Sequence, residues 1–282
     1  MASTVRSALT KAVAMLGMSD SADLDAQLLL ARLLDKPRSW LYTWPEQPLS
    51  PAQELAFANL VDRRRQGEPV AYLTGKRNFW KLELLVNPAV LIPRPETELL
   101  VEVALELGQD QQGPVADLGT GSGAIALALG LERPDWQIHA SELSDQALLT
   151  AMHNLQASGL QNVSLYSGSW FSPLPAIQFQ LVVSNPPYID AADPHLLQRE
   201  LAFEPRMALV AGEQGLADLQ QIAVEARAHL LPGGWLLLEH GWQQAEAVRL
   251  QLAQLGYLQI LTKQDHGGRD RVTLGRWTEQ EL

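Results

Sequence analysis

The segment from Val115 to Leu131 constrains the fold of this chain more than any other part of the sequence. It begins with a short apolar run, continues through the turn Gly119-Thr120-Gly121-Ser122-Gly123, and ends in the helix-forming run Ala124–Leu131. Glycines at alternate positions allow positive φ angles and let a ligand approach the backbone. The free N–H groups at the start of the helix favour a carboxylate or a phosphate. The segment therefore predicts a strand, a ligand-binding turn and a helix.

Two acidic residues accompany this turn. Asp117 lies at the end of the first strand, where it either faces the ligand or caps the turn. Glu142 closes a second apparent strand, Gln137–Ala140, 23 positions after Gly119, and an acidic side chain there can accept both hydroxyls of a ribose. The glycines follow the spacing G-x-G-x-G, whereas dinucleotide sites use G-x-G-x-x-G. This difference favours a ligand other than NAD.

Strands and helices alternate over the rest of the chain. The expected strands are 137–140, 163–166, 181–184 and 235–239, and the expected helices are 145–158 and 216–230. Such alternation predicts an α/β fold with a doubly wound, mostly parallel sheet. Ligands of these sheets bind at the carboxyl ends of the strands. Asp117, Glu142 and Asn185 all lie at such ends, so we expect them at one edge of the sheet.

The motif Asn185-Pro186-Pro187-Tyr188 follows the apolar strand that begins at Leu181. Two prolines fix φ at about −65° and supply no backbone N–H, so the turn mainly accepts hydrogen bonds. Asn185 adds a side-chain oxygen and Tyr188 adds a flat aromatic face, which together suit a planar group that carries an NH₂. An amide and an exocyclic base amine both fit this description. An isolated Asn-Pro pair is typical of a simple turn, and the glycine turn is what favours a binding site here.

Composition is that of an ordinary globular protein of 282 residues, long enough for two domains. Because the chain has no cysteine, it has no disulfide, thiol nucleophile or thiolate metal site. Its six histidines show no H-x-x-x-H pairing, so we expect no metal. No apolar run approaches a length of about 18 residues and no signal peptide is visible, which predicts a cytoplasmic enzyme.

Charge is distributed unevenly along the chain. Residues 1–92 carry a net charge of +2, and residues 93–282 carry −13. Binding to duplex nucleic acid normally needs a basic surface near the site. The acidic second part therefore argues against the nucleic-acid substrate that the Asn-Pro-Pro-Tyr motif would otherwise permit.

The first 75 residues predict a small helical bundle, with helices expected at 4–16, 21–34, 39–44 and 50–66. Ser50, Pro51 and Glu54 form a helix-start signal. The run 63–65 of three arginines at the end of the fourth helix either complements the helix dipole or docks an acidic partner. Extended pieces at 79–86 and 89–92, separated by an Asn-Pro pair, predict a hairpin that links the two halves.

The motifs together resemble a known family. Asp117–Gly123 followed by Asn185-Pro-Pro-Tyr188 resembles the class I S-adenosylmethionine-dependent methyltransferases that methylate planar nitrogen atoms. Two further stretches, Gly67-Glu-Pro-Val-Ala-Tyr-Leu-Thr-Gly75 and Ile92-Pro-Arg-Pro-Glu-Thr-Glu98, resemble the PrmC/HemK group. The resemblance runs from about residue 23 to residue 277 and includes Leu236-Leu-Leu-Glu-His-Gly-Trp242.

The resemblance implies a class I methyltransferase fold, which is Rossmann-like with an antiparallel hairpin at the sheet's edge. It implies a helical substrate-recognition domain at 1–75, a β-hairpin linker at 76–92 and a methyltransferase domain at 93–282. The implied reaction moves the methyl group of S-adenosylmethionine to the side-chain amide nitrogen (N5) of the glutamine in the Gly-Gly-Gln motif of class I peptide chain release factors. The product is S-adenosylhomocysteine, and no metal takes part.

The site residues expected from the motifs and the resemblance form two sets. The Asn185 side-chain oxygen and the Pro186 carbonyl would accept the two amide hydrogens, with Pro187 in the same slot and Tyr188 against the amide plane. The resemblance places Trp170 against the adenine, and Arg94 and Thr97 near the methionine end. The expected cofactor-binding residues are Asp117, Gly119, Thr120, Gly121, Ser122, Gly123, Glu142, Trp170 and Asn185.

The expected partner is a release factor, with no nucleic acid or membrane bound and with a monomeric chain. Three alternatives stay open on the sequence. A nucleic-acid amino methyltransferase would share the Asn-Pro-Pro-Tyr motif, and it would need a basic surface. A nicotinamide-dependent oxidoreductase would share the glycine turn, although it has no use for that motif. A module that only senses the cofactor would show no turnover.

Overall fold

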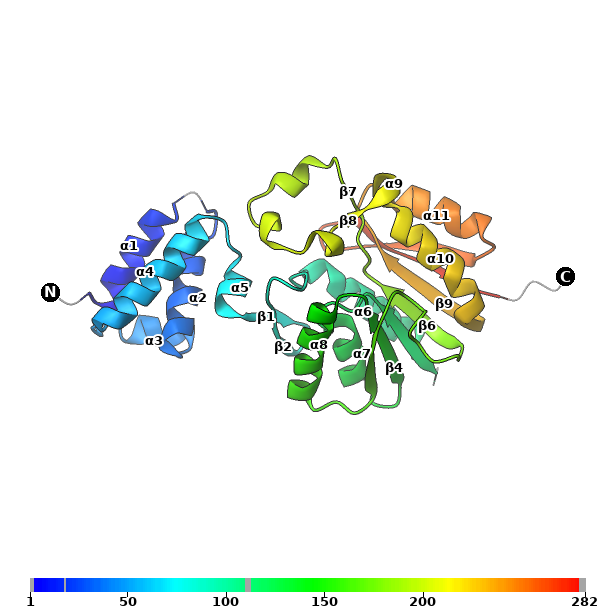
Figure 1. Ribbon diagram of the computed structural model, residues 1–282, viewed down its shortest axis with the longest axis horizontal. Coiled ribbons are helices and arrows are strands. Elements are labelled where there is room, and N and C mark those ends of the chain that lie inside the picture. Colours follow the sequence, from blue (N-terminus) through cyan, green and yellow to red (C-terminus); the bar gives the residue numbers. More distant parts are fainter. Residues whose placement is uncertain (1–2, 18, 110–112, 279–282) are drawn as a thin grey trace. The chain divides into compact units, whose positions relative to one another are not determined.

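The computed structural model describes residues 3–17, 19–109 and 113–278, which form two compact units (Figure 1). The first unit, called the helical unit, comprises Met1–Lys76 together with Leu197–Phe203. The second, called the catalytic unit, comprises Arg77–Leu196 and Glu204–Leu282. A short segment from the second half of the sequence therefore packs with the first unit. Among the described residues, no helix combines the length and the apolar character that a membrane span needs.

The helical unit is built on an apolar core from several amphipathic helices. Its helices are α1 (Val5–Met15), α2 (Ala22–Leu34), α3 (Arg38–Thr43), α4 (Pro51–Arg65) and α5 (Val70–Thr74). Val5, Leu29 and Leu30 are fully buried in this core. The four helices expected from the sequence are confirmed, and α5 was missed because its five residues are too few to show a helical period.

The start of α4 differs from the expected signal in its capping partner. The Ser50 hydroxyl accepts from the N–H of Gln53, and the Gln53 side chain accepts from the N–H of Ser50. This reciprocal pair is a capping box, which satisfies two N–H groups at the helix start. Glu54 instead accepts from the N–H of Ser3 at 2.7 Å.

The three arginines at the end of α4 are paired inside the helical unit. Arg63 binds Glu68, and Arg65 binds Asp62 at 2.9 Å. Arg64 is almost buried and binds Asp25 and Glu200, each at 2.7 Å. Glu200 belongs to the segment Leu197–Phe203, so this ion pair attaches that segment to α4. The positive charge of the run is therefore largely compensated within the unit.

The catalytic unit is organised around a seven-stranded sheet with the order β10-β11-β9-β6-β3-β4-β5. Its strands are β3 (Pro114–Leu118), β4 (Gln137–Glu142), β5 (Val163–Ser167), β6 (Phe179–Ser184), β9 (Leu230–Glu239), β10 (Leu258–Gln264) and β11 (Asp270–Arg276). The strands from β9 to β5 are parallel, and β11 pairs antiparallel with both β9 and β10. This arrangement confirms the predicted doubly wound sheet with an antiparallel edge.

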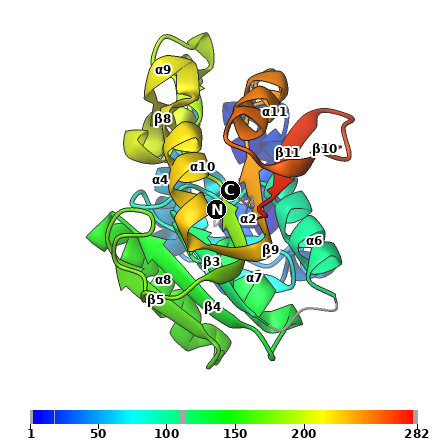
Figure 2. The ribbon, with the colours of Figure 1, turned by 90° about the vertical axis from the view of Figure 1, so that its right-hand side faces the viewer.

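Helices cover both faces of the sheet (Figure 2). The helices are α6 (Glu98–Leu107), α7 (Ala124–Glu132), α8 (Asp145–Ser158), α10 (Ala217–His229) and α11 (Ala245–Gln254). Alternate residues of β6 pack against the helices on opposite faces of the sheet. Leu181 and Val183 pack with α6 and α7, and Val182 packs with α10 and α11. The sheet is thus apolar on both faces, as a covered parallel sheet must be.

The predicted linker hairpin is wrong in its position. The two-stranded sheet consists of β1 (Lys76–Phe79) and β2 (Leu82–Leu85), and its turn lies at Trp80-Lys81. Trp80 has a φ of 55°, which is unusual for a bulky residue. Asn87 makes a separate turn, because its side-chain oxygen accepts from the N–H of Ala89 at 2.9 Å. The stretch 89–92 is consequently irregular and forms no second strand.

Several short elements lie in the connection between β6 and α10. They are β7 (Ile189–Asp190), η2 (Pro194–Leu197), η3 (Leu201–Phe203), η4 (Arg206–Ala208), β8 (Val210–Ala211) and α9 (Gly212–Gly215), while η1 (Pro95–Thr97) precedes α6. β7 and β8 pair in parallel. This pairing closes the connection beyond the Asn-Pro-Pro-Tyr motif and brings η4 back to the catalytic unit.

Candidate active site

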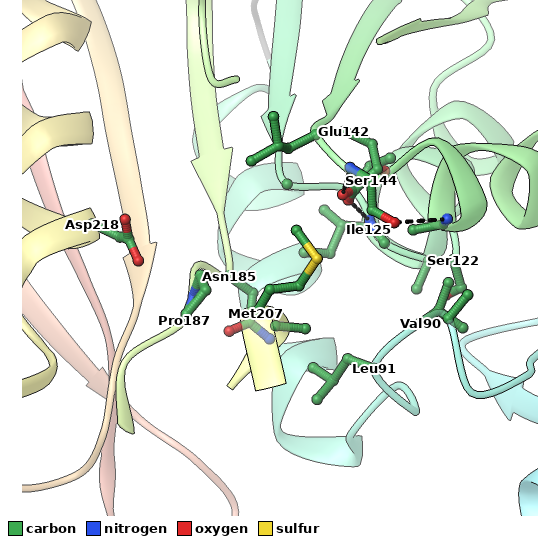
Figure 3. Close-up of a pocket in the computed structure, with 18 of the residues that line it drawn as sticks. Val90, Leu91, Ser122, Ile125, Glu142, Ser144, Asn185, Pro187, Met207 and Asp218 are labelled. Atoms are coloured by element: carbon green, nitrogen blue, oxygen red, sulfur yellow. Dashed lines mark hydrogen bonds between the residues drawn. The ribbon is translucent and has the colours of Figure 1, made fainter. Parts of the chain in front are cut away.

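A pocket of about 290 Å³ lies at the carboxyl ends of the parallel strands, where ligands of such sheets bind. Figure 3 shows Glu142 and Ser144 at the end of one strand and Asn185 and Pro187 at the end of another. Of the residues expected at the site, those that line the pocket are Gly119, Thr120, Gly121, Ser122, Glu142, Trp170, Asn185, Pro187 and Thr97. The pocket lining does not include Asp117, Gly123, Pro186, Tyr188 or Arg94.

The glycine turn has the backbone that its sequence predicts. Gly119, Gly121 and Gly123 have φ angles of 73°, 58° and 87°, values at which a side chain is strained. A Cβ at Gly121 would meet no protein atom within 4 Å, whereas one at Gly119 would lie 3.2 Å from the Trp170 ring. The turn is therefore open to a ligand at Gly121 and closed by Trp170 at Gly119.

The Glu142 carboxylate holds the glycine turn by accepting hydrogen bonds from backbone N–H groups. Its Oε2 accepts from the N–H of Gly121 at 2.9 Å, and its Oε1 accepts from the N–H of Ser144 at 2.8 Å. Each carboxylate oxygen can accept a second hydrogen bond. The side chain is thus fixed in place and can still receive hydroxyl donors from a ligand in the pocket.

Asp117 lies behind the turn and away from the pocket. Its Oδ2 accepts from the Thr120 hydroxyl at 2.6 Å and from the N–H of Ala126 at 3.1 Å. Complete burial raises the pKa of Asp117 to about 7. Its Oδ1 has no hydrogen-bond partner among the described residues. Asp117 consequently joins the turn to the first turn of α7, which is the capping role that the sequence left open.

Trp170 forms one wall of the pocket from a strained backbone position. Its φ of 44° lies in the left-handed region, which costs roughly 1–3 kcal/mol for a bulky residue. The ring packs over Gly119 and lines the pocket. A planar group in the pocket would therefore find an aromatic surface on this side.

The Asn185 side chain is anchored through its nitrogen. Nδ2 donates to the Thr97 hydroxyl at 3.1 Å, and Thr97 is a buried residue at the start of α6. Tyr188 points away from the pocket, because its hydroxyl donates to Glu239 Oε1 at 3.3 Å. Burial raises the pKa of Tyr188 above its ordinary value, so this hydroxyl keeps its proton. The flat face expected beside the amide slot is thus not part of the pocket lining.

Two buried glutamates near the site were missed by the sequence analysis. Glu204 accepts from the N–H of Ile92 at 3.1 Å and also binds Arg94. Glu239 is 1% exposed and lies at the end of β9. The only sequence signal for Glu239 was its place at the end of a strand in the block Leu236–Trp242. Within the described ranges, no group of three histidine or acidic side chains could hold a metal ion.

Comparison with known proteins gives two family matches. The PrmC N-terminal domain family matches residues 7–75, and the methyltransferase small domain family matches residues 95–214. The release factor glutamine methyltransferase of Salmonella typhimurium is 50% identical over 270 residues, which cover 96% of this chain and 98% of that protein. The protein of the same name from Vibrio cholerae is 49% identical over 285 residues, with 100% of both chains covered. This chain belongs to the release factor glutamine methyltransferase family.

Solved structures support the fold assigned to this family member. The T. thermophilus 16S rRNA N2 G1207 methyltransferase, in complex with AdoMet and guanosine, matches with a TM-score of 0.52 and 20% identity over 72% of this chain and 49% of that chain. The ribosomal protein L11 methylase of Lactobacillus delbrueckii subsp. bulgaricus matches with a TM-score of 0.51 and 20% identity over 69% of this chain and 84% of that chain. At these identities the matches show the methyltransferase fold alone.

Proposed function

We propose that this enzyme methylates the side-chain amide nitrogen of a glutamine in peptide chain release factors, with S-adenosylmethionine as methyl donor. The family to which the chain belongs supports this function. The structural observation that supports it most is that Asn185 and Glu142 line one pocket from the ends of β6 and β4, the two strands on either side of β3. Such a pocket can hold a nucleoside at one end and an amide at the other.

The pocket residues fit S-adenosylmethionine as a ligand. Glu142 would accept the ribose hydroxyls, and Trp170 would pack against the adenine. The turn Gly119–Ser122 would lie against the amino acid end, supported from behind by Asp117 and Gly123. When bound, S-adenosylmethionine supplies an electrophilic methyl group on a positively charged sulfur. The transfer leaves S-adenosylhomocysteine and releases one proton from the glutamine nitrogen.

The protein's contribution to this reaction is mainly positioning. An amide nitrogen is a weak nucleophile because its lone pair is delocalised. Asn185 Oδ1 and the Pro186 carbonyl would accept the two N–H hydrogens of the glutamine, and Pro187 would close the slot. Holding the nitrogen in line with the methyl group can contribute up to about 7–11 kcal/mol at the limit of ideal alignment. Tyr188 would act from behind the slot, through the position of the Asn-Pro-Pro turn.

We assign recognition of the release factor to the helical domain at 1–75, joined by the linker at 76–92 to the methyltransferase domain at 93–282. We take the partner to be a class I release factor that presents its Gly-Gly-Gln motif to a monomeric enzyme in the cytoplasm. The net charge of −13 on residues 93–282 supports a protein substrate over a nucleic acid.

The test is mass spectrometry of a purified release factor after incubation with the enzyme and S-adenosylmethionine. We expect one added methyl group on the glutamine of the Gly-Gly-Gln motif and none on a release factor in which alanine replaces that glutamine. Duplex DNA and RNA serve as competing substrates in parallel reactions. Methylation of nucleic acid in place of the release factor, or no turnover on any substrate, would refute the proposal.

A further inference from the structure

The Asn-Pro-Pro-Tyr turn is held firmly at its start and has few means of holding its own end. At the start, β6 ends at Ser184, which pairs with residues of both neighbouring strands. Pro186 and Pro187 have no backbone N–H, so the centre of the turn donates no hydrogen bond that could fix it. Its conformation therefore depends on what holds the residues that follow the prolines.

Gln244, the residue that precedes α11, holds that end of the turn. Its Nε2 donates to the Tyr188 carbonyl at 3.0 Å and to the Gln214 carbonyl at 3.2 Å. Its Oε1 accepts from the N–H of Gly241 at 2.9 Å. Both N–H donors of the amide are thus used, and since all three partners are backbone groups with fixed roles, the orientation of this amide is determined. One side chain joins three backbone segments.

The segment that Gln244 joins to the turn is strained. Glu213, Gln214 and Gly215 have φ angles of 51°, 58° and 83°, so three successive residues lie in the left-handed region. Side chains in this region persist only where the surrounding structure holds them, and the hydrogen bond to the Gln214 carbonyl is such a restraint. A Cβ at Gly215 would lie 2.1 Å from the Tyr188 carbonyl oxygen. Glycine at this position therefore lets the strained segment approach the end of the turn closely.

Both carbonyls that Gln244 holds belong to segments that form the pocket. β7 follows Tyr188 directly and pairs with β8, which leads into α9, and Figure 1 shows these three elements together. Val210 of β8 lines the pocket, as do Asn185 and Pro187 of the turn. Gln244 itself is not part of the pocket lining. It therefore restrains, from outside the pocket, both the turn that carries the proposed slot and the segment behind one wall.

We propose that Gln244 is a positioning residue that acts through the Tyr188 carbonyl to hold the Asn-Pro-Pro-Tyr turn in the conformation that accepts the substrate amide. The inference rests on the proposed function, because it takes the Asn185 oxygen and the Pro186 carbonyl as the two acceptors. These acceptors lie three and two residues before Tyr188. Without the two donors of Gln244, the chain after the prolines loses its restraint, and both acceptors move relative to the methyl group.

The test measures single-turnover methylation of release factor at saturating S-adenosylmethionine, with cofactor affinity measured by calorimetry on the same preparations. Gln244→Met keeps the length of the side chain and removes its donors and its acceptor. Gln244→Glu keeps an acceptor for Gly241 and removes both donors. We expect each variant to lower the rate about 10- to 100-fold and to change cofactor affinity less than about threefold, because Gln244 does not line the pocket. Gln243→Met, the same change at the neighbouring exposed glutamine, is the matched control and should keep the wild-type rate.

A double-mutant cycle separates positioning from a general loss of structure. If Gln244 acts through the turn, its substitution should lower the rate by a smaller factor in an Asn185→Ala background, where one acceptor is already absent. An equal loss in both backgrounds would overturn the inference, as would a Gln244→Glu rate within threefold of wild type or a fall in cofactor affinity in proportion to the rate. Gln244→Glu carries the test if Gln244→Met does not fold.

Wild-type enzyme in the same assay distinguishes failure of the inference from failure of the proposed function. If the wild type does not methylate release factor, the proposed function fails. If it does so and Gln244→Glu methylates equally well, only the role of Gln244 is refuted.

Discussion

Asn185 is the residue on which the proposed chemistry depends most directly. It lines the pocket with one branch of its amide fixed to Thr97, so its loss should affect orientation of the substrate more than binding of the cofactor. The buried Glu239 lies on the neighbouring strand, one residue beyond Leu238, which pairs with Ser184. A charge introduced at position 185 would therefore interact with the Glu239 carboxyl group as well as with the substrate amide.

We expect Asn185→Ala to lower the rate of methyl transfer by about 10²–10³, the cost of removing one oriented polar group from an active site, with S-adenosylmethionine affinity within about threefold of wild type. Asn185→Asp keeps two acceptors, yet it removes the NH₂ that donates to the Thr97 hydroxyl and adds a carboxylate one position beyond Ser184, whose strand partner Leu238 precedes the buried Glu239. We expect this variant to be impaired as well. Single-turnover methylation rates, and S-adenosylmethionine affinities measured by calorimetry on the same preparations, test both expectations. A loss of cofactor affinity in proportion to rate would make Asn185 a structural turn residue.

Glu239 should also make folding stability depend on pH. Burial raises the pKa of Glu239 to about 7 from its ordinary value of 4.5, against opposing effects of Thr97 and Arg271 and with a smaller repulsion from Glu96. A carboxyl group with a raised pKa binds its proton more tightly in the folded chain. Its stabilising contribution is therefore complete below about pH 4.5 and is lost as the pH rises through about 7.

We accordingly expect the melting temperature of the wild type to fall between about pH 5 and about pH 8, and to fall less in Glu239→Gln. Asp117, whose pKa is also raised to about 7, contributes the same trend in both proteins. Glu246→Gln, a change of an exposed carboxylate on α11, should keep the wild-type slope. Parallel curves for the wild type and Glu239→Gln would show that Glu239 is ionised throughout this range.

At the scale of elements, the connection from β6 to α10 supplies one wall of the pocket through Met207, Ala208 and Val210. Glu204 attaches this wall, because its buried carboxylate accepts from the N–H of Ile92 and binds Arg94. The wall is thus joined to the stretch that precedes α6 on the other side of the pocket.

We expect Glu204→Ala to lower stability by roughly 1–3 kcal/mol, since the buried N–H of Ile92 loses its acceptor. S-adenosylmethionine should also bind more weakly, because the wall that includes Met207 loses its contacts with Ile92 and Arg94. Asp193→Ala in the same connection is the control, because the Asp193 side chain binds the nearby His195 and does not line the pocket. Thermal melts and calorimetry measure both effects. Equal cofactor affinity in Glu204→Ala and Asp193→Ala would contradict this role.

Local patterns in the sequence were sufficient to predict most elements of this fold. The bounds of α8 are those expected, and each predicted strand of the main sheet is present. Elements of two to five residues, such as β7, β8 and α5, were missed because they are shorter than any recognisable period. The hairpin was misplaced because Asn87-Pro88 is a strong turn signal, whereas its actual turn contains Trp80, a residue that rarely adopts a positive φ.

The site was predicted less completely than the fold, for a physical reason. The glycine turn and Glu142 are recognisable because they are close in sequence and have a characteristic spacing. Glu204 meets Ile92 across 112 positions, and Asn185 meets Thr97 across 88. Such contacts are decided by the register of the sheet and by helix packing, which no local pattern reports. Glu239 and Glu204 could therefore be assigned only from the structure.

For the whole molecule, the division into two units suggests a division of tasks. All residues that line the pocket belong to the catalytic unit. The helical unit contributes none of them, although it exposes large apolar side chains such as Trp44 and Leu55, which are 55% and 75% exposed. Its arginine run is already paired internally. Apolar contact with the release factor is therefore better supported than attraction of an acidic partner by these arginines.

We expect a fragment that begins at residue 77 to bind S-adenosylmethionine as the full chain does, because the pocket is complete within it. It should methylate a Gly-Gly-Gln peptide and the full release factor about equally poorly, since the surface that recognises the folded substrate is gone. In the full chain, Trp44→Ala and Leu55→Ala should lower kcat/KM for the release factor and leave that for the peptide unchanged. These two variants keep the test valid if the fragment does not fold. Equal activity of fragment and full chain on the release factor would show that the helical unit has another task.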